Sequence, residues 1–135
     1  MVGNAAFRSV AAASAFAGTG PALTALLDSA DARTRRNAAG AAGNLVRHSG
    51  DAVAALASAG TAQRLLQRAV SDSDESVRSA ALFSLGTLAS YPQTRRMLLA
   101  LRPGLDARLA AADGLLRGSA ASQKAIRRLK RKLSQ

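Results

Sequence analysis

The chain has 135 residues, a net charge of +11 and no cysteine, and its residues are 48% hydrophobic but only 3% aromatic. The lack of cysteine excludes a disulfide framework, a thiolate nucleophile and the usual kind of zinc site. An interior of alanine, leucine and valine suits closely packed helices, whereas strands favour β-branched and aromatic residues. The composition therefore predicts one all-α domain, or a piece of a longer protein.

No apolar run in the sequence approaches the roughly 18 to 20 residues that span a bilayer. The N-terminal residues also lack the ordered charged, apolar and cleavage regions of a signal peptide. The lack of cysteine is compatible with a reducing compartment, and we expect the cytoplasm. The positive charge is uneven, because residues 117–135 carry seven cations and no acid.

In chain order, a short phrase recurs at intervals of about forty residues. Gly-Asn at residues 3–4 precedes Gly-Asn at 43–44 by 40 residues, and Gly-Asn-Leu at 43–45 aligns with Gly-Thr-Leu at 86–88, 43 residues later. These intervals lie in or near the range of roughly 40 to 47 residues that is typical of HEAT and armadillo repeats.

Two long helices are predicted at equivalent places in this repeat. Asp31 and Asp74 stand where N-caps are expected, just before the apolar periodicity begins. Each lies four residues before an arginine, Arg35 or Arg78, which is the favourable orientation for an ion pair along a helix. We therefore expect the two arginines to be held by these two aspartates.

Glycine and proline mark the breaks between the predicted helices. Gly20 ends one helix and Pro21 begins the next, and Gly60 lies in the corresponding later break. Short helices are predicted at 51–58 and at 92–101. Each unit thus has a short, a medium and a long helix, which is the three-helix armadillo plan rather than the two-helix HEAT plan.

The predicted fold is an all-α, right-handed α-solenoid of armadillo (ARM/HEAT-like) repeats, with about two complete repeats. In the long helix, alanines face more than one side, which predicts a helix sandwiched between close neighbours. The expected divisions are a partial repeat at 1–18, repeats at 19–58 and 59–101, a partial repeat at 102–116, and a basic amphipathic capping helix at 117–135.

Several phrases also carry a family resemblance: "VGNAAF", "LLDSADARTRRNAAGAAGNLVRHSG", "RLLQRAVSDSDESVRSAALFSLGTLASYPQTRRML" and "SQKAIRRLKRKL". The chain resembles the C-terminal armadillo repeats of the Fused family of serine/threonine kinases. The resemblance implies a docking platform for kinesin-related and axonemal proteins, with roles in the central-pair apparatus of motile cilia and, in animals, in Hedgehog signalling.

The catalytic part of that family is missing from this sequence. There is no glycine-rich loop before a VAIK-type lysine, no HRD and no DFG, so we expect no enzyme activity, no cofactor and no metal. Because Met1 falls inside a long helix of the repeat pattern, we expect a fragment, or a subunit whose first face another chain covers.

The candidate partner surface is the concave face that long armadillo helices form. An asparagine on each such helix commonly pairs with the backbone of a bound peptide, and Asn4 and Asn44 match that position, whereas the third copy has Thr87. The tryptophan that often precedes the asparagine is replaced by Gly40 and Phe83. The alternative is that Asn44 makes only local contacts. The candidate residues of this surface are Asn4, Asn44, Thr87, Arg36 and Phe83.

The basic tail is the second candidate. Ile126, Leu129 and Leu133 form one apolar stripe, as expected of a capping helix. The remaining positions suit an acidic partner, and tubulin tails, nucleic acid and anionic membrane are equivalent candidates on charge alone. The tail has no aromatic residue, which disfavours nucleic-acid stacking and membrane insertion. Its cations are Lys124, Arg127, Arg128, Lys130, Arg131 and Lys132.

The functional prediction is a non-catalytic protein-interaction scaffold, at the ciliary or flagellar axoneme. The alternative is a general armadillo or HEAT adaptor that binds acidic partners through its basic C-terminal helix. A HEAT-like enzyme would need clustered acid and base residues, and His48 at a helix end and the turn acids Asp72, Asp74 and Glu75 read more simply as helix-end and capping groups.

Overall fold

The computed structural model describes residues 20–48, 56 and 60–134, and these residues form helices and turns with no strand among them. Residues 20–26 form a further helical segment that precedes α2. The labelled helices are α2 (Ala32–His48), α4 (Thr61–Ser71), α5 (Glu75–Ala89), α6 (Pro92–Ala100), α7 (Arg102–Ala111), α8 (Asp113–Leu116) and α9 (Ala120–Leu133).

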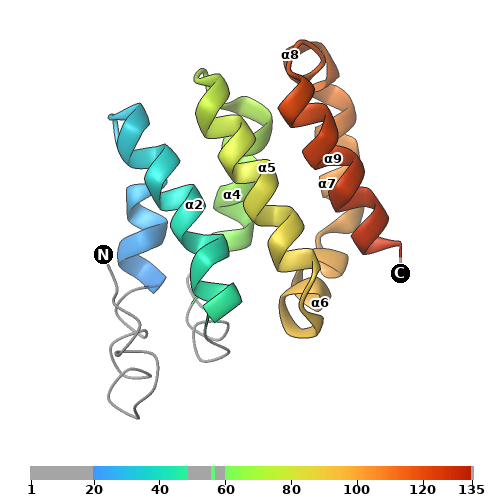
Figure 1. The fold of residues 1–135 in the computed structure, drawn as a ribbon, viewed down its shortest axis with the longest axis horizontal. Coiled ribbons are helices and arrows are strands. Elements are labelled where there is room, and N and C mark those ends of the chain that lie inside the picture. The colour runs from blue at the N-terminus through green and yellow to red at the C-terminus, as the bar shows by residue number, and fades with distance from the viewer. Residues whose placement is uncertain (1–19, 49–55, 57–59, 135) are drawn as a thin grey trace.

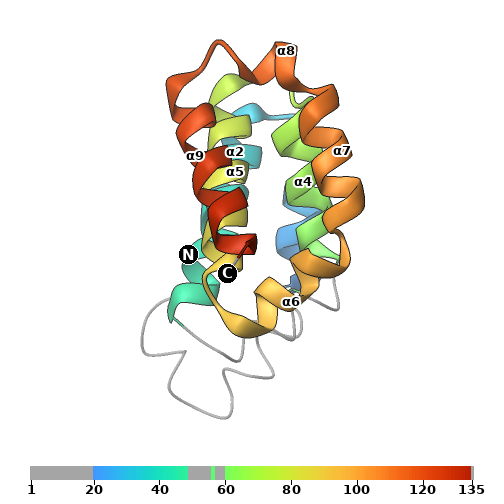
Figure 2. The same cartoon turned by 90° about the vertical axis from the view of Figure 1, so that its right-hand side faces the viewer.

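The helices form two layers. The long helices α2, α5 and α9 lie side by side in the first layer (Figure 1). The helices α4 and α7 form the second layer behind them, as the turned view in Figure 2 shows. This stacking of similar helical units is an α-solenoid of ARM/HEAT-like repeats, and the predicted fold class is confirmed.

The helix predicted at 92–101 is present as α6, which begins at Pro92, in the first turn where proline is well tolerated. Helix α7 is nearly as short, with 10 residues against 9 in α6, and the four-residue α8 separates it from the long helix α9. The short helix predicted at 51–58 falls almost entirely outside the described residues. The predicted boundaries between repeats stay predictions.

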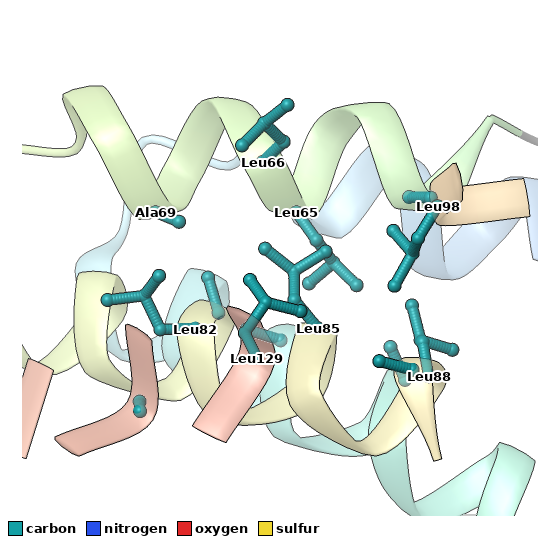
Figure 3. Close-up of a cluster of buried hydrophobic side chains, with 14 of the residues drawn as sticks. Leu65, Leu66, Ala69, Leu82, Leu85, Leu88, Leu98 and Leu129 are labelled. Atoms are coloured by element: carbon teal, nitrogen blue, oxygen red, sulfur yellow. The ribbon is translucent and has the colours of Figure 1, made fainter. Parts of the chain in front are cut away.

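The core lies between the two layers and is made almost wholly of leucine and alanine. Leucines from α4, α5, α6 and α9 meet there (Figure 3). Helix α5 is buried on most sides, because it packs against α2, α4, α6 and α9. The fully buried leucines of this cluster include Leu65, Leu82, Leu85, Leu98 and Leu129.

The repeated glycines lie where the next long helix approaches closely, Gly43 against the short, buried side chain of Ser84 and Gly86 against the flexible end of Arg128, which can shift. A Cβ atom on Gly43 would lie 2.9 Å from Oγ of Ser84 on α5, and one on Gly86 would lie 2.7 Å from Nη1 of Arg128 on α9. The Ser84 hydroxyl also donates a hydrogen bond to the backbone carbonyl of Ala39. The repeated glycine therefore marks the contact between successive long helices.

The predicted caps are present. The Asp31 carboxylate accepts a hydrogen bond from the Thr34 backbone N–H at 3.0 Å, and the Asp74 carboxylate accepts from the Ser76 and Val77 backbone N–H groups. These bonds satisfy donors that the first helical turn leaves free. Gly60, at the start of α4, has a φ of 70°, a left-handed conformation that glycine adopts without strain.

The predicted ion pairs along the helices are wrong. Arg35 binds Asp72 instead of Asp31, with Nε 2.8 Å from Oδ2 and Nη2 3.0 Å from Oδ1. Arg78 donates from Nη1 to the backbone carbonyl of Asp72 at 2.8 Å. The carboxylates of Asp31 and Asp74 already accept hydrogen bonds from backbone N–H groups. The turn between α4 and α5 places the buried carboxylate of Asp72 within reach of Arg35.

Helix α9 occupies the place after α5 in the row of long helices. Ser119 caps its start by accepting from the Ser122 backbone N–H at 3.1 Å, at a position that corresponds to the Asp74 cap of α5. Its predicted apolar stripe faces the protein, with Leu129 and Leu133 buried and Ile126 half-buried. Thus α9 is the third long helix of the layer as well as the last helix that the structure describes.

Candidate partner-binding face

The outer surface of the long-helix layer is the candidate site, because it presents exposed residues from three successive repeat units. These residues recur at the helical period on the side of each helix that faces away from the second layer. We call this surface the long-helix face. Its exposed or half-buried members are Arg33, Arg36, Gly40 and Asn44 on α2, Ser79, Ala80 and Phe83 on α5, and Lys124, Arg127 and Arg131 on α9.

The acids of the described part of the chain are mostly engaged elsewhere. Asp31 and Asp74 cap helices, and Glu75 is exposed in the first turn of α5. The other acids pair with arginines, as Asp28–Arg64, Asp72–Arg35, Asp72–Arg68, Asp106–Arg102 and Asp113–Arg117. Among the described residues, no acid forms a salt bridge with a cation of the long-helix face, although the Asp31 carboxylate interacts electrostatically with Arg33. The face therefore carries a net positive charge.

The buried carboxylate of Asp72 removes two arginines from the set available to a partner. Its side chain is fully buried and accepts bonds from Arg35, from Arg68 at 3.3 Å and from the Asp74 backbone N–H at 2.9 Å. Burial by itself raises the pKa of Asp72, but the hydrogen bond from Arg35 and the two nearby guanidinium charges outweigh it and hold this pKa below its usual value.

Phe83 is the exposed aromatic residue of the long-helix face, with 52% of its surface accessible. The guanidinium carbon of Arg128 lies 4.9 Å from the centre of its ring, which is cation–π geometry. Nη1 of Arg128 also donates to the Phe83 backbone carbonyl at 3.3 Å. Arg128 is therefore partly committed to holding α9 against α5, unlike the exposed cations beside it.

The structure separates the predicted site residues into different groups. Arg36, Asn44 and Phe83 are exposed on the long-helix face. Thr87 is buried, with 2% of its surface accessible, and its hydroxyl donates to the Phe83 carbonyl at 3.2 Å, so its side chain is not presented to a partner. Asn4 lies outside the described residues.

The tail cations also separate. Lys124, Arg127, Lys130 and Arg131 are exposed, whereas Arg128 and Lys132 are half-buried. What the sequence analysis missed is that α9 lies beside α5, so that its cations extend the surface of Arg36 and Phe83. The spacing of 45 residues between the capping residues Asp74 and Ser119 could have predicted that α9 follows α5 in the row of long helices.

The described residues contain no cluster of three or more side chains suited to hold a metal ion. His48 is exposed at the end of α2, next to Arg47, where a basic side chain suits the helix dipole. None of the described helices is both long and apolar enough to cross a bilayer. What the described part offers chemically is a charged, largely polar surface.

Comparisons with known proteins agree with the helical-repeat architecture. The family model for the HEAT repeat matches residues 63–91, which include most of α4 and all of α5. Among curated proteins, the chain is similar to serine/threonine-protein kinase 36 of Pongo abelii, with 38% identity over 101 residues. The matched part is 74% of this chain but only 8% of that kinase. No solved structure gives a significant match to the chain.

Proposed function

We propose that this chain is a non-catalytic docking module, the helical-repeat region of a Fused-like kinase, and that it acts in the assembly or structure of the central apparatus of motile cilia. The observation that carries the proposal is the long-helix face, where three stacked helices form one surface and the cations of α2 and α9 make no salt bridge with a described acid. The partial similarity to a serine/threonine kinase supports the family assignment.

A solenoid suits this role because its repeats contact mainly their neighbours and leave an extended surface open. On this proposal the partners are axonemal and kinesin-related proteins in a larger complex, and the protein is located in the cytoplasm and the axoneme. A second candidate is a general adaptor for acidic partners such as tubulin tails. The exposed cations of α9, including Lys130, favour this candidate. Helix α9 is the last helix in the row formed by α2, α5 and α9.

Crosslinking in the native complex tests the proposal with unusual selectivity. The three lysines of the chain, Lys124, Lys130 and Lys132, all lie in α9. When a lysine-reactive crosslinker is applied to isolated axonemes, crosslinked lysines in peptides of this sequence therefore report the neighbours of α9. The variant Arg36→Lys adds a reporter on α2 and keeps the charge.

Crosslinks from both helices to proteins of the central apparatus are the expected result. Crosslinks confined to tubulin would favour the adaptor, and microtubule cosedimentation before and after removal of the tubulin tails then measures how much of that binding is electrostatic. A chain that is absent from axonemes and binds duplex DNA tightly and specifically would overturn both candidates.

A further inference from the structure

Two arginines in equivalent places of successive long helices have different partners. On α2, Arg35 donates from Nη1 to the backbone carbonyl of Ser29 at 2.9 Å, and from Nε and Nη2 to the Asp72 carboxylate. On α5, Arg78 lies 43 residues later and donates from Nη1 to the backbone carbonyl of Asp72 at 2.8 Å. In both cases Nη1 reaches the carbonyl six residues earlier. However, Nε of Arg78 is buried without a partner, and its Nη2 donates to no described residue.

The sequence explains why Arg78 has no carboxylate beside it. Asp72 lies two residues before the N-cap of α5, and the residue two before the N-cap of α9 is Arg117. The Arg117 side chain is 77% exposed and pairs with Asp113. No described acid forms a salt bridge with Arg78, although only 8% of the surface of this residue is accessible.

The turn between α8 and α9 lies at the same end of the layer as Arg78. Helices α5 and α9 start at this end, as Figure 1 shows. Oγ of Ser79, the next residue on α5, lies 3.2 Å from Oγ of Ser122 in the first turn of α9. The α8–α9 turn therefore stands beside Arg78 as the α4–α5 turn stands beside Arg35. It has room on one side, because Gly118 is exposed and a Cβ there would meet no described atom within 4 Å apart from its chain neighbours.

The unpaired edge of Arg78 has a definite chemical preference. The Nε and Nη2 groups of a guanidinium donate in one plane and match the two oxygens of a carboxylate. Buried donors without an acceptor are destabilising, so occupation of this edge is favourable. Arg68 also has a buried Nε without a partner, but its Nη1 is already paired with the Asp72 carboxylate at 3.3 Å. Among the described residues, Arg78 has only a neutral carbonyl as its acceptor.

We propose that Arg78 and the α8–α9 turn form a binding site for one carboxylate group of another molecule, in the place that Asp72 takes beside Arg35. The carboxylate accepts from Nε and Nη2 of Arg78. This site is separate from the exposed cations of the long-helix face, so the inference goes beyond the proposed docking function and does not depend on it. Two sources share this chemistry: a free small carboxylate, and an aspartate or glutamate side chain of a partner protein.

Nuclear magnetic resonance of the ¹⁵N-labelled full chain can observe the arginine Nε–H groups directly. The signal that disappears in the variant Arg78→Lys assigns this group. Sodium acetate is titrated against sodium chloride at constant ionic strength. The Arg78 signal should move progressively and saturate, whereas the Arg68 signal should stay in place. Acetamide, which has the same shape but no charge and one acceptor oxygen, should move the Arg78 signal little.

A second ligand distinguishes the two sources. The capped tripeptide acetyl-Gly-Asp-Gly-amide presents the carboxylate as a side chain, and its Asn counterpart is the control. An affinity for the Asp peptide that equals or exceeds the affinity for acetate assigns the site to a side chain of a partner protein. A lower affinity for the peptide assigns it to a free small carboxylate. Either result supports a carboxylate site at Arg78.

An exchange of two residues supplies the carboxylate from within the chain. Asp113→Arg combined with Arg117→Asp keeps the composition and the net charge. It reproduces the order of Arg68 and Asp72 at the start of α5. The Arg78 signal should then be shifted without acetate and should no longer respond to it. Arg117→Ala is the matched control, because it leaves the edge of Arg78 unpaired and should keep the acetate midpoint within about twofold. Circular dichroism establishes that each variant is folded.

Three results would overturn the inference: a response to acetate no larger than the response to acetamide, a larger response to sulfate than to acetate, or an acetate response that persists in the exchanged variant. The first would mean that water alone serves this edge, and the second that the site does not select a planar carboxylate. None of these results bears on whether the chain is crosslinked within the axoneme. The docking function can therefore stand if the carboxylate site fails.

Discussion

The substitution Asp72→Asn tests whether the buried carboxylate holds the turn between α4 and α5. In the folded chain, Asp72 accepts from Arg35 through both carboxylate oxygens, from Arg68, and from the Asp74 backbone N–H. Asparagine has one acceptor oxygen and an amide that would face arginine donors. The two guanidinium groups would then lose the carboxylate with which they are paired.

Removing one partner of a buried ion pair commonly costs about 3 to 5 kcal/mol. Here the arginines keep some contact with water, with 11% and 19% of their side-chain surfaces accessible, so the low end of that range applies. We expect the free energy of unfolding to fall by about 3 kcal/mol at pH 7. Urea unfolding followed by circular dichroism at 222 nm measures it. Asp106→Asn is the control, because its pair with Arg102 is exposed and should contribute less than about 1 kcal/mol.

The effect must depend on pH with a definite sign. The pKa of Asp72 is lowered in the folded state from its usual 3.8, so the unfolded chain takes up its proton first as the pH falls. The stabilisation is complete well above pH 3.8 and is lost as the pH falls through the folded-state pKa. The difference between wild type and Asp72→Asn should therefore shrink towards pH 3. A loss that is equal at pH 7 and pH 3, or a loss at pH 7 no larger than that of Asp106→Asn, would refute this reasoning.

Three further predictions concern packing and capping. Gly43→Ala should lower the free energy of unfolding by about 1 to 3 kcal/mol, because its Cβ would meet Ser84. Gly40→Ala, in the same helix, should raise the free energy of unfolding by about 0.5 to 1 kcal/mol. Thermal melts of the two variants measure both changes, and changes of the same sign would contradict the contact between Gly43 and Ser84. Leu129→Ala should lower the free energy of unfolding by about 2 to 5 kcal/mol and reduce hydrogen-exchange protection in α9. The control Leu115→Ala, at a position 45% exposed, should change both quantities little. Unchanged hydrogen exchange in α9 of the Leu129→Ala variant would count against the packing of α9 on α5. Asp74→Ala should cost about 1 kcal/mol through loss of the α5 cap, and a chemical unfolding midpoint identical to wild type would show that the cap is dispensable.

Local features of the fold were predictable because their causes are local. Asp74 caps the start of α5, and Pro92 is the first residue of α6. Both could be predicted because a capping oxygen and the fixed φ of proline act within one turn of the chain. The alanine-rich sides of α2 likewise predicted close helix packing, and α2 packs closely against α5. A neighbour on the other side of α2 stays a prediction.

The candidate face could be predicted only in part. The exposure of Arg36 and Asn44 agrees with their place in the repeat. The same alignment predicted that Thr87 is also exposed, but the structure shows that it is buried. An alignment gives the direction of a side chain on its helix. It does not give what the neighbouring helix places over it.

By itself, the sequence determined that this is an all-helical repeat protein with excess positive charge, and where several of its helices begin. Only the tertiary structure decided that Arg35 binds Asp72, 37 residues away, rather than Asp31, and that α9 joins α2 and α5 to form one basic face. The physical reason is that helix periodicity and capping act over a few residues, whereas ion-pair choice and surface charge depend on which helices are packed against one another.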